Sequence, residues 1–173
     1  MTIINGLLAE LEQEAATTRR VLERIPQEHL SWRPHPKSMS LGQLALHVAV
    51  VPGLVAESAA LDTVPARPEF IHPEAETAAE LVPKLAESVA RAKQLLGSYD
   101  DAKMSATWRL QNAGQDLLVM PRVAFVRAIM LNHWYHHRGQ LLVYLRLLNL
   151  PVPSVYGPTA DENPFVLDPA PAW

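Results

Sequence analysis

Apolar residues recur every three to four positions in four segments of the sequence, and this helical period constrains the fold more than any other feature. In the first segment the stripe consists of Ile4, Leu7, Leu8, Leu11, Ala15, Val21 and Leu22. The segments run from about Thr2 to Ile25, from Ser40 to the connection that begins at Asp62, from about Thr77 to Leu96, and from Pro121 to about Leu148. Four such helices predict an all-α protein built as a four-helix bundle.

Residues with special backbone preferences predict where these helices begin, bend and end. Ser40 followed by Gln43 has the spacing of a capping box, in which each side chain satisfies a backbone N–H group of the other residue. Pro52 and Gly53 predict a kink or a break inside the second helix. Gly97 is suited to the left-handed conformation that often follows a helix, so we expect the third helix to end there.

Between the third and fourth helices the sequence predicts a short β-hairpin. TWRLQ and DLLVM flank NAG and Gln115, with Asn and Gly at the turn. Pro121 is a favoured first helical residue and opens the fourth helix. The long connection DTVPARPEFIHPEAE allows a crossover between the second and third helices, and the turn-rich tail SVYGPTADENPFVLDPAPAW is expected to pack irregularly over one end of the bundle. The length of the chain predicts that residues 1–173 form one domain.

Composition excludes several classes of protein. A net charge of -3 with scattered basic residues argues against nucleic-acid binding. The absence of cysteine excludes disulfides and thiolate metal sites, so any sulfur chemistry must use a sulfur atom of the substrate. The first twenty residues lack a basic start followed by an apolar core, and Pro, Gly, Arg or His interrupts the longest apolar runs. We therefore expect no secretory signal, no membrane span and a cytoplasmic location.

Histidines cluster in the fourth helical segment. NHWYHHRGQL, residues 132–141, contains three of them within five positions. On a helical wheel at ~100° per residue, six residues share one face: Val126, Met130, His133, His137, Gln140 and Tyr144. His136 lies roughly 60° from His133, at the edge of this face. The pattern predicts that His133 and His137, four residues apart, stack one above the other towards the core.

His47 in the second segment shares its stripe with Leu44, Val51 and Leu54, so we expect it to face inwards as well. Burying a polar group without a partner costs roughly 1–3 kcal/mol. One shared divalent metal ion would satisfy all three inward imidazoles at once. Three neutral nitrogen ligands would leave the fourth position of a tetrahedral ion open, which is the pattern of catalytic zinc sites.

Other interpretations of the histidines stay open at this point. A single histidine on an apolar face is usually a hydrogen-bonded core residue, and a pair four residues apart can bond across a bundle without metal. Positions 134 and 135 are Trp and Tyr, so the glutamate of the HExxH metalloprotease motif is missing. Imidazole also binds nickel, copper and iron, so the residue types do not select the metal.

Three stretches of the sequence resemble the DinB superfamily, a group of damage-inducible bacterial four-helix bundle proteins. NHWYHHRGQLLVYLRLLNLPVPSVYGPTADE resembles the C-terminal signature of that family, SWRPHPKSMSLGQLALHVA its second-helix signature, and VMPRVAFVRAIMLNH its lead into the fourth helix. The similarity covers roughly residues 2–163 in the same order. It implies a metal site whose ligands are one histidine of the second helix and two of the fourth, at the positions His47, His133 and His137, with a water completing the shell.

The resemblance also implies zinc or nickel as the ion and a homodimer as the assembly. Some members of the family are thiol-dependent transferases or isomerases that use a low-molecular-weight bacterial thiol. A divalent ion lowers the pKa of a coordinated thiol or water. One hypothesis is therefore a metal-dependent enzyme that acts on a small molecule, with thiol transfer favoured over hydrolysis. The other is a non-catalytic, metal-binding dimer that acts in a stress response. The sequence identifies no general base.

Most of the remaining polar and aromatic residues are expected to stabilise the fold rather than to take part in the site. We expect His136 to be structural, and the alternative is that it contacts a metal ligand from outside or transfers a proton. Arg138 is expected to point away from the metal and to form a salt bridge or cap the tail. Gln140 is a candidate for orienting a ligand from outside. Asp161 and Glu162 are expected to hold the tail in place rather than to reach the site. We expect His29, His35 and His72 to be solvated, Arg19 and Arg20 to form an exposed helix face, and Trp32, Trp108 and Trp134 to make core or dimer contacts.

Overall fold

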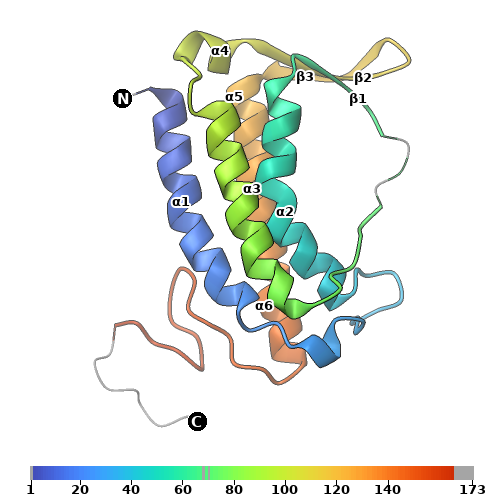
Figure 1. The fold of residues 1–173 in the computed structure, drawn as a ribbon, viewed down its shortest axis with the longest axis vertical. Helices are drawn as coiled ribbons and strands as arrows, with labels where there is room; N and C mark the ends of the chain where they lie inside the picture. The colour runs from blue at the N-terminus through green and yellow to red at the C-terminus, as the bar shows by residue number, and fades with distance from the viewer. Residues whose placement is uncertain (1, 68, 70, 166–173) are drawn as a thin grey trace.

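The computed structural model describes residues 2–67, 69 and 71–165. Four long helical rods form a bundle with a small sheet across one end (Figure 1). The rods are α1 (Ile3–Leu22), α2 (Leu41–Ala60), α3 (Leu81–Leu96) and a composite of α5 (Arg122–Phe125), η3 (Val126–Asn132) and α6 (His133–Leu147). The shorter helical elements are η1 (Gln27–His29), η2 (Ala78–Glu80) and α4 (Asp101–Ser105). The predicted four-helix bundle is confirmed.

The order of the helices around the bundle differs from their order along the chain. Helix α1 packs against α3 and α6, and α2 packs against the same two helices. Figure 1 shows α2 and α3 side by side and running in the same direction, because the connection between them returns along the outside of the bundle. The crossover that the long connection allowed is therefore present, and α2 lies directly against α6.

The sheet consists of β1 (Thr63–Pro65), β2 (Thr107–Asn112) and β3 (Gln115–Pro121), in the order β1-β2-β3. Strands β2 and β3 form the predicted antiparallel hairpin. Its turn residues are Ala113 and Gly114, both with positive φ, as a two-residue hairpin turn requires. Strand β1, which pairs in parallel with β2, comes from the connection and was not predicted.

Pro52 lies inside α2 without breaking it. Because proline has no N–H group, the carbonyl of Val48 one turn earlier is left available, and the indole N–H of Trp134 donates to it at 2.7 Å. The N–H of Gly53 donates to the hydroxyl of Ser88 at 2.8 Å. The helix bends partway along and continues (Figure 1), so a kink is the correct alternative and a break is wrong.

Some local predictions hold and others are wrong. The capping box is confirmed: Gln43 N–H donates to Ser40 Oγ at 3.1 Å, and Ser40 N–H donates to the Gln43 side chain at 2.9 Å. Gly97 is not left-handed, since its φ is -63° and the chain leads on through a turn to α4. Pro121 closes β3, and the helix begins one residue later. Helix α1 ends at Leu22. Two hydrogen-bonded turns, closed by the N–H groups of Arg24 and Ile25, follow it before Pro26.

Leu54 is the clearest error in the predicted core. We expected it on the buried stripe of His47, but its side chain is 51% exposed. His47 is itself only half-buried, so its stripe runs along the border of the core rather than through the centre. Leu44, Val48 and Val51, which lie nearer the centre, are buried as expected.

The aromatic residues and the tail behave as predicted. Trp108 and Trp134 are buried, and the ring of Trp108 stacks on Phe125 with 3.7 Å between ring centroids. In the tail, Asp161 pairs with Arg146 and accepts from the N–H of Val152. Glu162 pairs with Arg20 and accepts from the N–H of Ser154, so Arg20 is a tail contact as well as part of a helix surface. The last part of the predicted tail, 166–173, lies outside the described residues.

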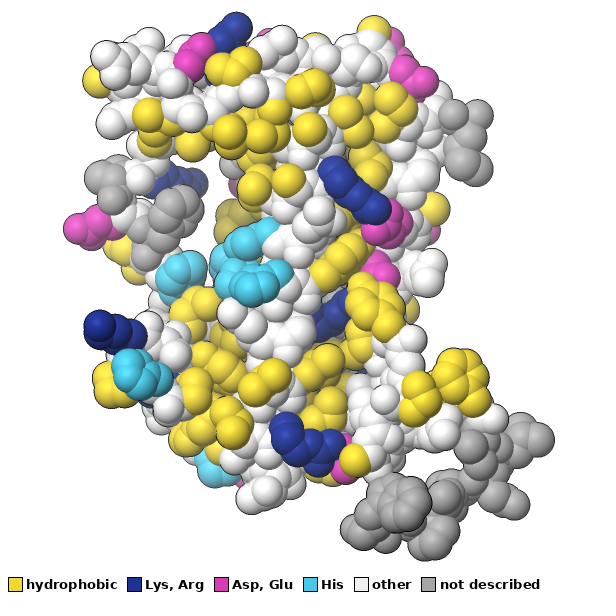
Figure 2. Space-filling view, turned by 180° about the vertical axis from the view of Figure 1, so that it is seen from behind, with side chains coloured by type: hydrophobic (Ala, Val, Ile, Leu, Met, Phe, Trp, Pro, Cys, Tyr) yellow, Lys and Arg dark blue, Asp and Glu magenta, His cyan; other side chains and the backbone are white. Residues whose placement is uncertain are grey.

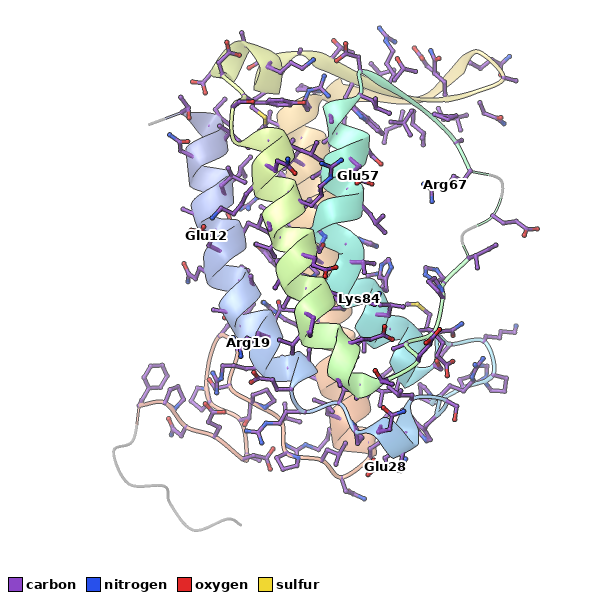
Figure 3. All side chains as sticks on the ribbon, in the orientation of Figure 1. Glu12, Arg19, Glu28, Glu57, Arg67 and Lys84 are labelled. Atoms are coloured by element: carbon purple, nitrogen blue, oxygen red, sulfur yellow. The ribbon has the colours of Figure 1, made fainter. Side chains whose placement is uncertain are left out.

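The outer faces of the helices are charged. Figure 3 shows the labelled side chains of Glu12, Glu57 and Lys84 projecting away from the core. Some of these side chains form surface ion pairs, such as Glu12 with Lys93 and Glu57 with Arg91. Exposed pairs of this kind contribute little stability, typically about 0–1 kcal/mol each.

Helix α2 has the most apolar composition of the long helices. Among the described residues it alone has the length and hydropathy of a membrane-spanning helix, with a mean hydropathy of 1.3 over the best window. However, 56% of that window is buried inside the bundle, as expected for a core helix that packs against two neighbours. Its apolar composition therefore follows from its central position.

Candidate metal centre

His47 of α2 and the pair His133 and His137 of α6 lie together where the two helices pack. One ring nitrogen of each histidine lies within 4.8 Å of those of the other two. The Nε2 atoms of His133 and His137 are 2.9 Å apart. The ring of His47 has its centroid 5.2 Å from that of His133 and 4.6 Å from that of His137. The structure thus brings together the three residues that the sequence singled out.

The separations suit a single small cation. Zinc binds imidazole nitrogen at about 2.0–2.1 Å, so two nitrogens of a tetrahedral site lie roughly 3.3 Å apart. The 2.9 Å between the two Nε2 atoms of α6 is close to that value. Because no two of the three ligand nitrogens are more than 4.8 Å apart, the rings need to move only slightly inwards to bind one ion. The pair on α6 is already arranged as two corners of one coordination shell.

All three histidines are held neutral by their surroundings. Burial is the main cause that lowers the pKa of each ring, and in His47 it lowers the pKa to about 3. Neighbouring imidazoles, which repel one another's protonated forms, lower these pKa values further: His72, His133, His136 and His137. A neutral imidazole keeps a lone pair on one nitrogen, which is the form that binds a metal.

Two nitrogens of the triad remain without a hydrogen-bond partner among the described residues. They are Nε2 of His47 and Nδ1 of His133, and both are buried. Buried polar atoms are nearly always hydrogen-bonded, so an unpartnered one calls for an explanation. A cation shared by the triad would be bound by the lone pair of His47 Nε2 and so would give this atom a partner. The donor set therefore fits a metal ion that prefers nitrogen ligands.

A stretch of π-helix precedes the two histidines of α6. Residues Val126–Asn132 form η3, in which each backbone bond spans one residue more than in an α-helix. Such stretches occur frequently at functional sites. The helical wheel assumed an uninterrupted α-helix and could not reveal this. Its prediction for His133 and His137 still holds, because both residues lie within the regular α6.

Gln140 and His136 extend the cluster along α6. The side-chain oxygen of Gln140 lies 2.8 Å from Nδ1 of His137. Its side-chain nitrogen lies 3.1 Å from Nε2 of His136. His136 is exposed, and its ring centroid is 5.0 Å from that of His137. The proposed role for Gln140 in orienting a ligand therefore has a direct contact behind it, and His136 lies just outside the triad.

His72 is the residue that sequence reasoning missed. We expected it to be solvated, but its ring lies edge-on to His47 with 5.2 Å between centroids. Gln43 donates to the backbone carbonyl of His72 at 2.9 Å, which ties the connection to the start of α2. Only the crossover of that connection places His72 here, and no local pattern in IHPE signals it. By contrast, His35 is exposed as predicted.

Arg138 points to a different side of α6, about 100° around the helix axis from His137. It is only 2% exposed and forms a salt bridge of 2.6 Å with Glu14 of α1. It also donates to Thr18 at 3.0 Å and to the Tyr156 hydroxyl of the tail at 2.6 Å. The prediction that it points away from the site and contacts an acid and the tail is confirmed.

The triad lies near the surface rather than at the centre of the core. Figure 2 shows histidine side chains gathered on one face of the molecule, beside an opening between the bundle and the connection. A separate hollow of about 360 Å³ lies between α1 and α3 and is lined mainly by alanine, valine and leucine side chains. That hollow offers no metal-binding side chain among the described residues, since its only charged lining residues are the cationic Arg19 and Lys93, so we assign no chemistry to it.

Comparison with known proteins gives a consistent result. The sequence profile of the DinB family matches residues 1–164. YrdA of Bacillus subtilis (strain 168), which carries the description uncharacterized protein, is 26% identical over 168 residues, covering 92% of this chain and 91% of YrdA. A DinB-like protein from Bacillus cereus ATCC 10987 has a similar structure, with a TM-score of 0.69, 24% identity and coverage of 88% of this chain and 97% of that one.

A more distant structure is that of YfiT from Bacillus subtilis. It has a TM-score of 0.62 and 13% identity, and the match covers 84% of this chain and 87% of YfiT. YfiT is described as a probable metal-dependent hydrolase with an unusual four-helix bundle topology. At this identity the likeness concerns the fold. Because the family profile spans nearly the whole described chain, this protein belongs to the DinB family.

Proposed function

We propose that this protein binds one divalent metal ion, zinc or nickel, through His47, His133 and His137, and that it is an enzyme acting on a small molecule. The observation that carries the proposal is the convergence of three neutral imidazoles on one point, with the buried Nε2 of His47 lacking any other partner among the described residues. A water is expected to complete the shell when no substrate is present.

The protein's own contribution to the chemistry is to hold three uncharged donors in place. Burial keeps the rings deprotonated at neutral pH, and Gln140 contacts the outer nitrogen of His137. When bound, a divalent ion would supply Lewis acidity that lowers the pKa of a coordinated thiol or water. Neutral ligands cancel none of the charge of such an ion, so the triad favours an anionic fourth ligand.

We favour transfer of a low-molecular-weight thiol over hydrolysis. The chain contains no cysteine, so the sulfur would come from a cosubstrate. The description of YfiT as a probable metal-dependent hydrolase supports the alternative reaction, in which a metal ion would activate water instead of a thiol. A non-catalytic metal-binding dimer of a stress response is the third candidate. The opening beside the histidines in Figure 2 supports the catalytic candidates, because it gives a small molecule access.

Homodimer formation, a small-molecule substrate, the absence of nucleic-acid and membrane partners, and a cytoplasmic location remain predictions. Exposed apolar side chains on β3 are compatible with a contact between chains: Leu117, Leu118 and Val119 are 57%, 37% and 47% exposed. Light scattering on the purified protein measures the assembly directly.

The enzyme proposal is tested with zinc-loaded protein, low-molecular-weight thiols and an aryl chloride as acceptor. In thiol transfer a carbon–sulfur bond forms, chloride leaves and the thiol proton passes to solvent. We expect conjugation that requires both the thiol and zinc and that disappears in His47→Ala. The exposed His35→Ala is the matched control and should keep full activity.

Thiol-independent cleavage of an activated ester by the same preparation would replace transfer with hydrolysis. A protein that binds zinc at the triad but catalyses neither reaction would favour the non-catalytic candidate.

A further inference from the structure

We propose that Gln140 is a positioning residue for the triad, which fixes the proton of His137 on Nδ1 and so turns the lone pair of Nε2 towards the shared point. This inference rests on the proposed metal site and adds a residue to it. It also connects the exposed His136 to the triad through one side-chain amide.

The contacts of Gln140 are specific to this role. Both polar atoms of its half-buried side chain are used on histidine rings: the oxygen lies 2.8 Å from His137 Nδ1, and the nitrogen lies 3.1 Å from His136 Nε2. The position three residues after His137 places Gln140 on the next turn of the same helix face. No element other than α6 is needed to form this arrangement.

The hydrogen bonds that run from His137 through Gln140 to His136 have only one arrangement of donors and acceptors that leaves Nε2 of His137 free to bind a metal. A neutral imidazole carries a single proton. If Nε2 of His137 is to present a lone pair to a cation, the proton must be on Nδ1, and its partner must be an acceptor. The oxygen of Gln140 is that acceptor. The amide N–H₂ group then donates to Nε2 of His136, which accepts it when Nδ1 of His136 carries the proton.

The alternative arrangement would cost the protein a ligand. If the amide N–H₂ group faced His137, Nδ1 of that ring would have to accept, and Nε2 would carry the proton. That proton would point at Nε2 of His133, 2.9 Å away, where the cation would lie. Outer hydrogen bonds of this kind fix the tautomer and ring orientation of metal-binding histidines in general, and their loss costs roughly 10–100-fold in metal affinity.

His137 differs from the other two ligands in the surroundings of its outer nitrogen. The opposite nitrogen of His133 is buried without a side-chain partner among the described residues, and the ring of His47 lies against the rings of His72, His133 and His137. Of the three ligands, His137 has a side-chain partner for its outer nitrogen. Gln140 therefore controls the affinity of the triad through one ring.

The test measures the zinc dissociation constant by competition with a chelator for the parent and three variants. Gln140→Leu keeps a similar volume but has no acceptor, and we expect its dissociation constant to rise by about 10–100-fold. Gln140→Glu keeps an acceptor and should bind zinc at least as tightly as the parent. Tyr144→Phe is the matched control, since it removes a polar contact to Met39 one turn further along α6 without touching the triad.

A second measurement reads the proton directly. In the zinc-loaded parent, ¹⁵N–¹H correlation of the imidazoles should show the proton of His137 on Nδ1 and slow exchange with solvent. Gln140→Leu should lose that protected signal. A simple structural role for Gln140 would leave the signal in place and would not be rescued by Gln140→Glu.

Equal zinc affinity in Gln140→Leu and the parent would overturn the inference, as would an equal loss in Tyr144→Phe. A parent that binds no zinc at all would instead overturn the metal site itself. The two failures are therefore distinguishable in one series of titrations.

Discussion

His137 and Arg138 are neighbours in the sequence but belong to opposite kinds of polar cluster. Arg138 enters a cluster that satisfies itself: Glu14, Thr18 and the Tyr156 hydroxyl take up its guanidinium. The Tyr156 hydroxyl in turn donates to Glu14 at 2.9 Å. His137 belongs to a cluster of three neutral imidazoles that offer the same kind of metal-binding nitrogen. Two of these rings have a buried nitrogen without a partner among the described residues.

The difference teaches how to separate a structural polar cluster from a binding site. Opposite charges and hydrogen-bonding groups complete one another on the α1 side of α6, so that cluster needs no further component. On the α2 side, like groups meet and the hydrogen bonds cannot be completed from within. We infer that the first cluster stabilises the fold and that the second is completed by a ligand.

The largest expected effect is on the self-satisfied cluster. Arg138→Met leaves the buried Glu14 carboxylate without its counter-charge and should lower the free energy of unfolding by about 3–5 kcal/mol. His137→Leu in metal-free protein should change it by no more than about 1 kcal/mol. Urea denaturation of both variants measures this. If the two losses were equal, the distinction between the clusters would be wrong.

The next effect concerns the ligand itself. Zinc at a hundredfold excess over its dissociation constant should raise the free energy of unfolding of the parent by about 2.7 kcal/mol. His133→Ala should gain nothing, because it lacks one of the three donors. Arg138→Met, although destabilised, should gain the same increment as the parent. Thermal denaturation with and without zinc provides the comparison, and an equal gain in His133→Ala would contradict it.

A smaller effect is expected from pH in metal-free protein. The pKa of His47 falls from 6.5 in the unfolded chain to about 3 in the folded protein, mainly through burial. Below pH 6.5 the unfolded state takes up a proton that the folded state does not, so stability is fully present above this value and decreases as the pH falls towards 3. His133 and His137 act in the same direction.

Urea midpoints between about pH 7.5 and about pH 5 test this. His47→Leu should have a flatter profile than the parent over that range. The same slope in both proteins would show that His47 is not the buried neutral group inferred from its surroundings.

The smallest effect is expected where the tail meets the self-satisfied cluster. Tyr156→Phe removes one hydroxyl that bridges Arg138 and Glu14, but the salt bridge remains. We expect a loss of about 1 kcal/mol and no change in zinc affinity. A loss as large as that of Arg138→Met would mean that the tail, rather than the ion pair, completes this cluster.

The bundle and the inward direction of the three histidines could be predicted because both follow from local periodicity. The helical period of the four segments identifies the buried faces, and the spacing of His133 and His137 keeps them on one face whatever precedes α6. His47 lies before the bend at Pro52, so its direction was also determined locally. Both helices present these faces to each other in the structure.

The errors arise where the tertiary arrangement decides. His72 reaches the triad only because the connection crosses over outside the bundle, and β1 exists only because β2 lies next to it. Leu54 shares the face of His47 but lies at the border of the core. The near-complete burial of Arg138 required knowledge of Glu14 on a distant helix. None of these features has a signature within a single segment.

The central claim is that three imidazoles from two helices hold one cation. Elemental analysis of untagged parent protein, His47→Ala, His133→Ala and the control Arg138→Met tests it most directly. We predict close to one divalent ion per chain in the parent and in the control, and strong loss in both histidine variants. Full retention of the ion in both histidine variants would contradict the account.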